Sequence, residues 1–308
     1  MRDAHTIVGQ PGGDWRVWLK TSRPFTLTAS VSPVLVGTAL AAFEGVFQPL
    51  NFVATLLSCL FLQIGTNYFN EYFDYRYGLD HAGSLGASTV IFRKEMTPGQ
   101  VLGGGIACFV IAVLLGLVLI YLVGPAIVLF GLTGLLIAYF YSARPFKFSS
   151  RGLGDVMVYI AMGLLMTWGS YYVQIQNWSW NAFAASVSVG FLVTAILNMN
   201  NLRDYQDDLA VNKKTLPVRF GQRFGRFFHA FLLMGSYVAI VLFALVGLLP
   251  LMVLVTWITF PMAVLNVRSV FVATERKAFI VGIKRTSLLH LLFGVVLSLA
   301  FVIAIWLR

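Results

Sequence analysis

Charged side chains are scarce in this sequence. Asp, Glu, Lys and Arg account for 11% of the 308 residues, and hydrophobic residues account for 58%. A soluble domain has about 25% charged and about 45–50% apolar residues. This composition excludes an ordinary soluble domain and predicts an integral membrane protein.

Cysteine is scarcer still, which excludes a cysteine-based metal or redox site. The two cysteines, Cys59 and Cys108, both lie inside apolar runs, and their spacing matches no metal-binding or redox motif. We expect both to pack as small apolar side chains.

Long hydrophobic runs are what the sequence has in abundance. A helix that spans a bilayer needs about 17–25 predominantly apolar residues. The sequence therefore predicts an all-α, single-domain membrane bundle over residues 1–308, with residues 1–24 as a segment on the cytoplasmic membrane surface and with cytoplasmic loops that cap the bundle. Nine transmembrane helices are expected, at residues 25–43, 52–73, 101–122, 125–142, 153–173, 180–200, 227–247, 250–272 and 286–307.

The net charge of +10 is unevenly placed along the chain. With nine spans, the N-terminus and the loops after the second, fourth, sixth and eighth spans share one side, which holds every Lys and Arg except Arg308 and every acidic residue except Glu44. The positive-inside rule makes this side cytoplasmic. We therefore predict a multi-pass protein of the cell membrane with its N-terminus and its chemistry in the cytoplasm. Its partner is the lipid bilayer and not nucleic acid, and no obligatory protein partner is indicated.

Two acidic stretches end two of the apolar runs on the cytoplasmic side. The first extends from Asn67 to Asp80 and the second from Asn200 to Asp208. Residues four apart share one face of a helix, so each stretch aims an amide and a carboxylate at one point. The residues with suitable oxygens are Asn70, Glu71, Asp74 and Asp80 in the first stretch, and Asn200, Asp204 and Asp208 in the second.

Basic residues lie on the same side as the acidic stretches. Each has two interpretations, an anchor at the membrane interface or a ligand for an anion. The residues concerned are Arg23 before the first span, Arg144 and Lys147 between the fourth and fifth spans, and Arg203 and Lys213 in and after the second acidic stretch.

Carboxylate and amide oxygens that converge form a site for a hard divalent cation, and magnesium suits such a site when phosphate oxygens complete its coordination. Arg and Lys nearby are sensible if that cation carries a diphosphate. A diphosphate that binds at the end of an apolar bundle is best explained by an attached lipid chain. The aromatic residues of the first stretch, such as Tyr68 and Phe69, then have a use in stabilising an allylic cation.

These residues resemble the motifs of the UbiA-type intramembrane aromatic prenyltransferases. The resemblance covers nearly the whole chain: nine spans, Arg23-Pro24, both acidic motifs and the segment from Tyr141 to Pro145. The second motif is similar to the branch that prenylates 1,4-dihydroxy-2-naphthoate in menaquinone synthesis. The chain departs from the family at Glu71, where Asp is common, and at Gly78, which puts Asp80 two residues later than the third acidic position of several branches.

The resemblance implies a magnesium-dependent enzyme that transfers a polyprenyl group from a polyprenyl diphosphate to an aromatic acceptor. For the naphthoate, the carboxylate leaves as carbon dioxide. Asn70, Asp74, Asp204 and Asp208 are the implied catalytic residues, and with Glu71 and Asp80 they are the implied metal ligands. The diphosphate is expected to contact Arg23, Arg144, Lys147, Arg203 and Lys213.

Other functions remain open from the sequence. A membrane transporter would use similar residues, although it usually places its site at the bilayer midplane. A lipid phosphotransferase with clustered Asp is a second class, and its expected Asp-Gly-x-x-Ala-Arg run is absent. Within the family, the acceptor is open between the naphthoate, 4-hydroxybenzoate, an ether-lipid glycerol phosphate and a tetrapyrrole. The length of the prenyl chain and the oligomeric state are not indicated.

Overall fold

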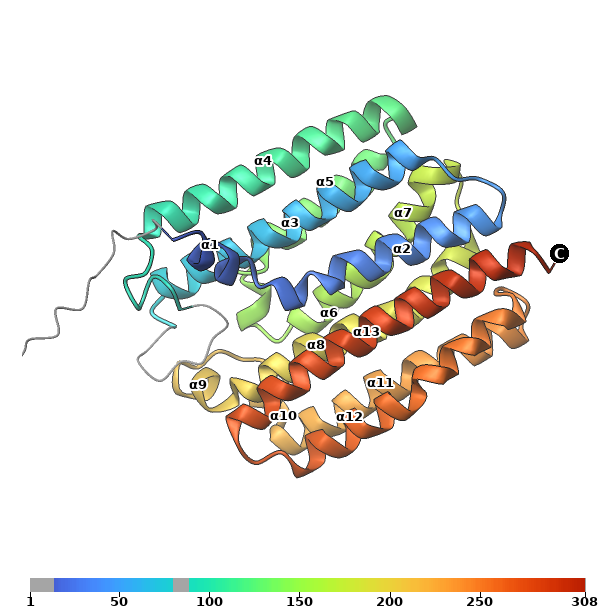
Figure 1. Cartoon of the computed structure of the whole chain (residues 1–308). Coiled ribbons are helices and arrows are strands. Elements are labelled where there is room, and N and C mark those ends of the chain that lie inside the picture. Colours follow the sequence, from blue (N-terminus) through green and yellow to red (C-terminus); the bar gives the residue numbers. More distant parts are fainter. Residues whose placement is uncertain (1–13, 80–88, 308) are drawn as a thin grey trace, which may run out of the picture.

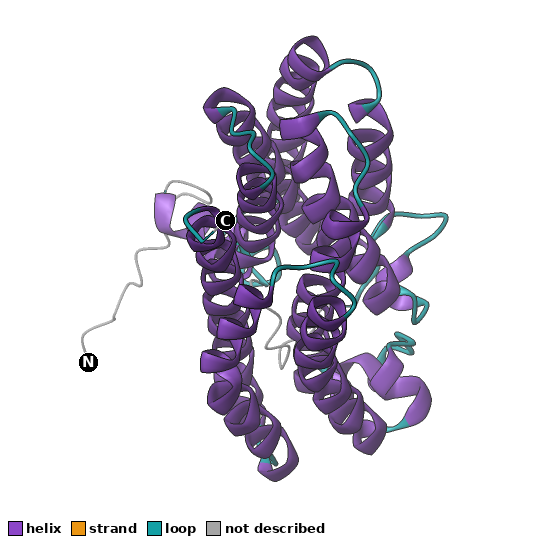
Figure 2. Cartoon of the chain, turned by 90° about the vertical axis from the view of Figure 1, so that its right-hand side faces the viewer, coloured by secondary structure: helices purple, strands orange, loops and turns teal. Residues whose placement is uncertain are grey.

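The computed structural model describes residues 14–79 and 89–307. Asp80, one of the predicted metal ligands, lies outside the described residues. Every regular element within them is a helix, as the composition predicts, and the two views of the chain contain only helices and connecting loops (Figures 1 and 2).

The helices follow the apolar runs, and several runs are interrupted. The fifth run consists of α6, a π-helical segment (Tyr159–Leu165) and α7, and the eighth consists of a 3-10 segment (Leu251–Thr259) and α12. Two further 3-10 turns occupy Pro24–Thr26 and Phe148–Ser150. The α-helices are α1 (Trp15–Ser22), α2 (Thr28–Phe43), α3 (Pro49–Arg76), α4 (Pro98–Val123), α5 (Ile127–Phe140), α6 (Gly154–Val158), α7 (Met166–Ile175), α8 (Trp180–Arg203), α9 (Tyr205–Ala210), α10 (Leu216–Phe220), α11 (Gln222–Leu245), α12 (Phe260–Val272) and α13 (Arg276–Ile305).

Seven helical stretches within the described residues are long and apolar enough to cross a membrane, and an eighth is reached if the pair Trp15–Thr26 and Thr28–Phe43, bent by 50°, counts as one span. By length and composition, seven or eight of the nine predicted spans are found within the described residues. The remaining run is α5, which has only 14 residues. It is short because Gly124 (φ 99°) and Pro125 end α4, and the chain turns away again after Tyr141.

The helices lie side by side along the bundle (Figure 1). The largest hydrophobic core joins α2, α7, α8, α11 and α13, with fully buried side chains such as Leu40, Leu192, Leu233 and Phe293. The π-helical segment lies directly against α8. The approach is so close that a Cβ added to Gly163 would overlap with the backbone of Gly190. Two glycines therefore permit the close approach that sets one wall of the cavity described below.

The ends of α3 and α8 that carry the acidic motifs lie at the same end of the bundle as α1, α9 and α10, opposite to the C-terminus (Figure 1). This placement agrees with the sequence-based expectation that both motifs share one side.

Candidate functional site

The first acidic motif occupies the last turns of α3. Asn70 and Asp74 lie one turn apart, and the Oδ1 atom of Asn70 accepts a hydrogen bond from the hydroxyl of Ser142, which follows α5. Asp74 keeps a quarter of its side chain exposed. The motif is therefore held against the loop after α5 while its carboxylate stays accessible.

Glu71 faces away from this group. Its residue is 3% exposed, and its two carboxylate oxygens accept hydrogen bonds from the backbone N–H groups of Thr89 (3.0 Å) and Ile91 (3.2 Å). The carboxylate thus binds the segment that returns from the loop after α3.

The second motif lies where α8 ends and α9 begins. Asp204 is the residue between the two helices, and Arg203 donates hydrogen bonds from Nε (2.7 Å) and from a terminal nitrogen (2.6 Å) to its two oxygens. Burial acts to raise the pKa of Asp204, but the charge and hydrogen bonds of Arg203 lower it below its usual range. Arg203, expected at the diphosphate, therefore pairs with Asp204 in this structure.

Lys213 joins the two motifs. Its Nζ atom lies 3.5 Å from Oδ1 of Asp208 and 4.0 Å from Oδ2 of Asp74. Burial acts to lower the pKa of Lys213, but the charges of Asp74, Asp208 and Asp204 raise it above its usual range. Asp74 and Asp208 share this one ammonium, while Asp204 is paired with Arg203. Burial is the main cause that raises the pKa of Asp208 to about 6, and Asp204 and Asp74 add to it.

The structure thus brings together Asp74 on α3 and Asp208 on α9, which the sequence places far apart. Within the described residues, no three His, Cys, Asp or Glu side chains form a group that could hold a metal ion. A positive charge, the ammonium of Lys213, nevertheless stands between the two carboxylates. Magnesium in proteins is commonly held by one or two carboxylates together with phosphate oxygens and water. Asp74 and Asp208 therefore fit this ion as part of a site that a phosphate ligand completes.

Arg144 and Lys147, in the loop after α5, gather around Tyr77 at the end of α3. The Nζ atom of Lys147 lies 3.9 Å from the centre of the Tyr77 ring, and the guanidinium of Arg144 lies 5.2 Å from it. Both distances suit a cation–π contact. Burial, together with the positive charge of Arg144, lowers the pKa of Lys147. The loop therefore places two cations beside the first motif.

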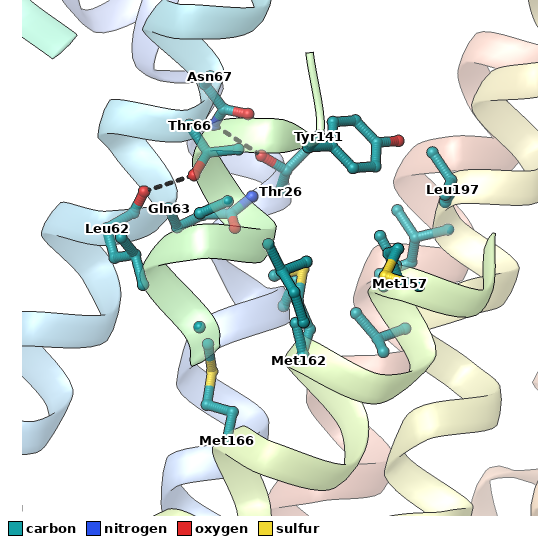
Figure 3. Close-up of a pocket in the computed structure, with 18 of the residues that line it drawn as sticks. Thr26, Leu62, Gln63, Thr66, Asn67, Tyr141, Met157, Met162, Met166 and Leu197 are labelled. Carbon is teal, nitrogen blue, oxygen red and sulfur yellow. Dashed lines mark hydrogen bonds between the residues drawn. The ribbon is translucent and has the colours of Figure 1, made fainter. Parts of the chain in front are cut away.

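A cavity of about 160 Å³ opens next to these groups. Its polar residues include Arg23, Asn70, Tyr141 and Asn200, and most of its remaining lining is apolar. Figure 3 shows Asn67, Thr66 and Tyr141 at one end, and Met162 and Met166 further along. A second cavity of about 270 Å³ is almost entirely apolar. The two share lining residues on α3, α5, the π-helical segment and α7: Cys59, Leu62, Gly134, Ala161 and Met166.

Three residues near the cavity carry interactions that the sequence did not single out as functional. Ser142 binds Asn70 as described above, and Asp155, 3% exposed, accepts a hydrogen bond from Asn201 at 3.3 Å. Burial raises the pKa of the Tyr141 hydroxyl, and the negative charge of Asp155 adds to the shift.

Comparison with known proteins places these features in a family. The profile of the UbiA prenyltransferase family matches residues 30–288. The 1,4-dihydroxy-2-naphthoate octaprenyltransferase of Bacillus subtilis is 34% identical over 289 residues, covering 94% of this chain and 92% of the relative. The protein of the same description from Escherichia coli is 33% identical over 239 residues, covering 76% and 78%.

A solved structure agrees with this at the level of the fold. A UbiA homolog from Archaeoglobus fulgidus, bound to GPP and Mg2+, superposes with a TM-score of 0.65 at 16% identity, covering 92% of this chain and 99% of that one. The resemblance predicted from the two acidic motifs is confirmed, because the family profile extends from α2 into α13. The chain belongs to the UbiA prenyltransferase family.

Proposed function

We propose that this protein transfers a polyprenyl group from a polyprenyl diphosphate to 1,4-dihydroxy-2-naphthoate. The observation that carries the proposal is the convergence of Asp74 and Asp208 on the ammonium of Lys213. These groups lie next to a cavity that is polar at one end and apolar along the rest. A substrate with an anionic head and a long apolar chain matches this division. The acceptor is proposed from the names of the two relatives and from the second motif.

In this proposal, Asn70, Asp74, Asp204 and Asp208 hold magnesium, which supplies Lewis-acid stabilisation of the departing diphosphate. The chain's own cations take the outer oxygens of the diphosphate. Lys213 exchanges its carboxylate partners for the diphosphate, and Arg203 does so in part. The residues proposed for this role are Arg23, Arg144, Lys147, Arg203 and Lys213.

The reaction breaks the bond between C1 of the prenyl chain and the diphosphate oxygen, and the electron pair leaves with the diphosphate. The allylic cation meets the acceptor carbon that carries the carboxylate. A new carbon–carbon bond forms there, carbon dioxide departs, and its electron pair restores the aromatic ring. Aromatic side chains near the polar end, such as Tyr141, are placed to stabilise the cation.

Glu71 has a different part in the proposal. Because both of its oxygens bind backbone N–H groups of residues 89–91, we assign it to holding the loop after α3 and not to the metal. Asp80 keeps its sequence-based assignment as a metal ligand.

We also propose that all nine apolar segments cross the bilayer, with α5 as a short ninth span, and that the end with both motifs faces the cytoplasm. The support is the distribution of Lys and Arg, which leaves only Arg308 on the opposite side when nine spans are counted.

The identity of the acceptor is tested by measuring the carbon dioxide released from its carboxylate. Membranes that contain the protein are supplied with magnesium, octaprenyl diphosphate and 1,4-dihydroxy-2-naphthoate labelled in its carboxylate, with 4-hydroxybenzoate in a parallel reaction. The proposal predicts prenylated naphthoquinol and one labelled carbon dioxide per product. Prenylation of the benzoate alone would overturn the assignment of the acceptor.

A further inference from the structure

The turn from α1 into the 3-10 segment Pro24–Thr26 is made at Arg23, which has an unusual backbone conformation. Its φ angle is 55°, in the left-handed region. The stretch Trp15–Thr26, which contains Arg23, is bent by 50° relative to Thr28–Phe43. A residue with a Cβ in this region is strained and persists only where its surroundings hold it. The sequence offers no glycine here, so another group must hold the turn at Arg23.

That group is the side-chain amide of Asn67 on α3. Its Nδ2 atom donates a hydrogen bond to the carbonyl oxygen of Ser22 (2.8 Å) and another to the hydroxyl oxygen of Thr26 (3.3 Å). The Thr26 hydroxyl in turn donates to the carbonyl oxygen of Arg23 (2.9 Å). Asn67 is 4% exposed, so one buried amide is hydrogen-bonded to the chain on both sides of Arg23. Figure 3 shows its contact with Thr26.

These hydrogen bonds of Asn67 fix the backbone of Arg23 and so direct its side chain toward the cavity. Arg23 lines the cavity together with Asn70 and Tyr141, and its charge acts on the Tyr141 hydroxyl. Its Nε atom is buried and has no hydrogen-bond partner among the described residues. A buried guanidinium N–H without a partner costs free energy, and an anion in the cavity would satisfy it.

We propose that Asn67 is a positioning residue that holds the Arg23 guanidinium toward the diphosphate. Asn67 itself contacts the chain on both sides of Arg23, at Ser22 and Thr26, and takes no part in binding metal or diphosphate. This inference rests on the proposed function, since it requires that a diphosphate binds beside Arg23. It separates Asn67 from Asn70, one turn further along α3, which faces Ser142 and the metal site.

The test measures inhibition by inorganic diphosphate with magnesium, because this probe has the anionic head without the prenyl chain. The Asn67→Leu variant has a side chain of similar size and loses both hydrogen bonds. It is combined with Arg23→Gln in a double-mutant cycle. Asn51→Leu is the matched control, because Asn51 is also buried on α3 and donates to a backbone carbonyl, that of Val173 at 2.9 Å, but lines neither cavity.

We expect Asn67→Leu to raise the inhibition constant of diphosphate about fivefold, the effect of one misplaced hydrogen-bonding group. The same change is expected to have almost no further effect in the Arg23→Gln background, while the KM of the aromatic acceptor stays constant. Asn51→Leu should lower the melting temperature and leave the inhibition constant unchanged.

An equal rise in the inhibition constant in both Arg23 backgrounds, or an equal rise in Asn51→Leu, would show that Asn67 acts through general stability. An unchanged constant in Asn67→Leu would also overturn the inference. Failure of diphosphate to inhibit the parent protein would instead contradict the proposed function.

Discussion

At the scale of single residues, the two carboxylates of the first acidic motif on α3 face different partners. Asp74 points toward Lys213 and the second motif, whereas Glu71 binds the backbone of residues 89–91. Both are carboxylates within one turn and a half of α3, and their sequence context alone assigns both to a metal. Their surroundings distinguish them, because a carboxylate that accepts two buried N–H groups has few lone pairs left for an ion.

This division predicts the behaviour of Glu71→Gln. The amide keeps one acceptor oxygen but turns an NH2 group toward a backbone N–H, so we expect the free energy of unfolding to fall by about 1–3 kcal/mol. The magnesium concentration that gives half-maximal activity should stay within about twofold of the parent. Thermal unfolding and a magnesium titration of activity measure the two effects. A magnesium requirement that rises as far as in Asp74→Asn would restore Glu71 as a metal ligand.

A second prediction at this scale concerns Tyr77. Its ring faces Lys147 and Arg144, and its hydroxyl accepts a hydrogen bond from the backbone N–H of Arg144 at 3.3 Å. Tyr77→Leu removes the ring, and we expect the KM of the prenyl diphosphate to rise by about 3- to 30-fold, the range of one to two cation–π contacts. Tyr77→Phe keeps the ring and is the control, with a KM within about threefold of the parent. Equal effects of the two substitutions would count against the role of the ring.

At the scale of elements, the two cavities meet where α3, α5 and the π-helical segment come together. Gly134 on α5 lines both cavities, and a Cβ on it would have only Leu62 nearby, at 3.9 Å. A side chain at this position would therefore project into open space between the polar cavity and the apolar one.

The prediction for Gly134→Leu follows from this position. The leucine side chain should narrow the passage for the prenyl chain, and one overpacked contact costs about 1–3 kcal/mol. We therefore expect kcat/KM to fall about tenfold or more for octaprenyl diphosphate, and to stay within about threefold of the parent for geranyl diphosphate. Gly103→Leu on α4 is the control, because Gly103 also has open space around it but lines neither cavity. Equal losses with both substrates would mean that the chain does not pass Gly134.

The elements also show which parts of the structure could be predicted from the sequence. Apolar runs predicted the long helices closely, as in the run 52–73 that became α3 (Pro49–Arg76), because length and hydropathy are local properties. The spacing of Asn70 and Asp74 predicted that both lie near one helix end. The meeting of Asp74 with Asp208 depends on how α3 packs relative to α8 and α9, so the sequence indicated it only through the family resemblance. The roles of Asn67 and Glu71 depend on contacts with distant backbone, for which one sequence holds no signal.

At the scale of the whole molecule, the asymmetric distribution of charge argues for one orientation in the membrane. Glu44, the acidic residue expected on the outer side, accepts a hydrogen bond from Asn181 at 3.0 Å and one from the hydroxyl of Tyr171. This network ties the ends of α2, α7 and α8 together at the end of the bundle away from the acidic motifs. The end of the bundle away from the acidic motifs thus has a structural use for Glu44, whereas we propose that the chemistry takes place at the other end.

The orientation and the ninth span are tested together by labelling single cysteines in a variant without Cys59 and Cys108. Ala126 and Arg151 are exposed positions before and after α5. We expect Ala126→Cys to react with a membrane-impermeant maleimide on intact cells, and Arg151→Cys to react only after permeabilisation. Reaction of both on the same side would show that α5 does not cross the bilayer, and the reverse pattern would invert the orientation.

The central claim is that both acidic motifs act on one diphosphate, and a double-mutant cycle tests it most directly. Magnesium-dependent prenyl transfer is measured for the parent, Asp74→Asn, Asp208→Asn and the double variant. We expect each single substitution to lower kcat/KM about a hundredfold or more, and the double variant to be within a few fold of the weaker single variant, because groups that act as one unit are not additive. Losses that multiply in the double variant, or full activity in either single variant, would contradict the convergence of the two motifs on a common site.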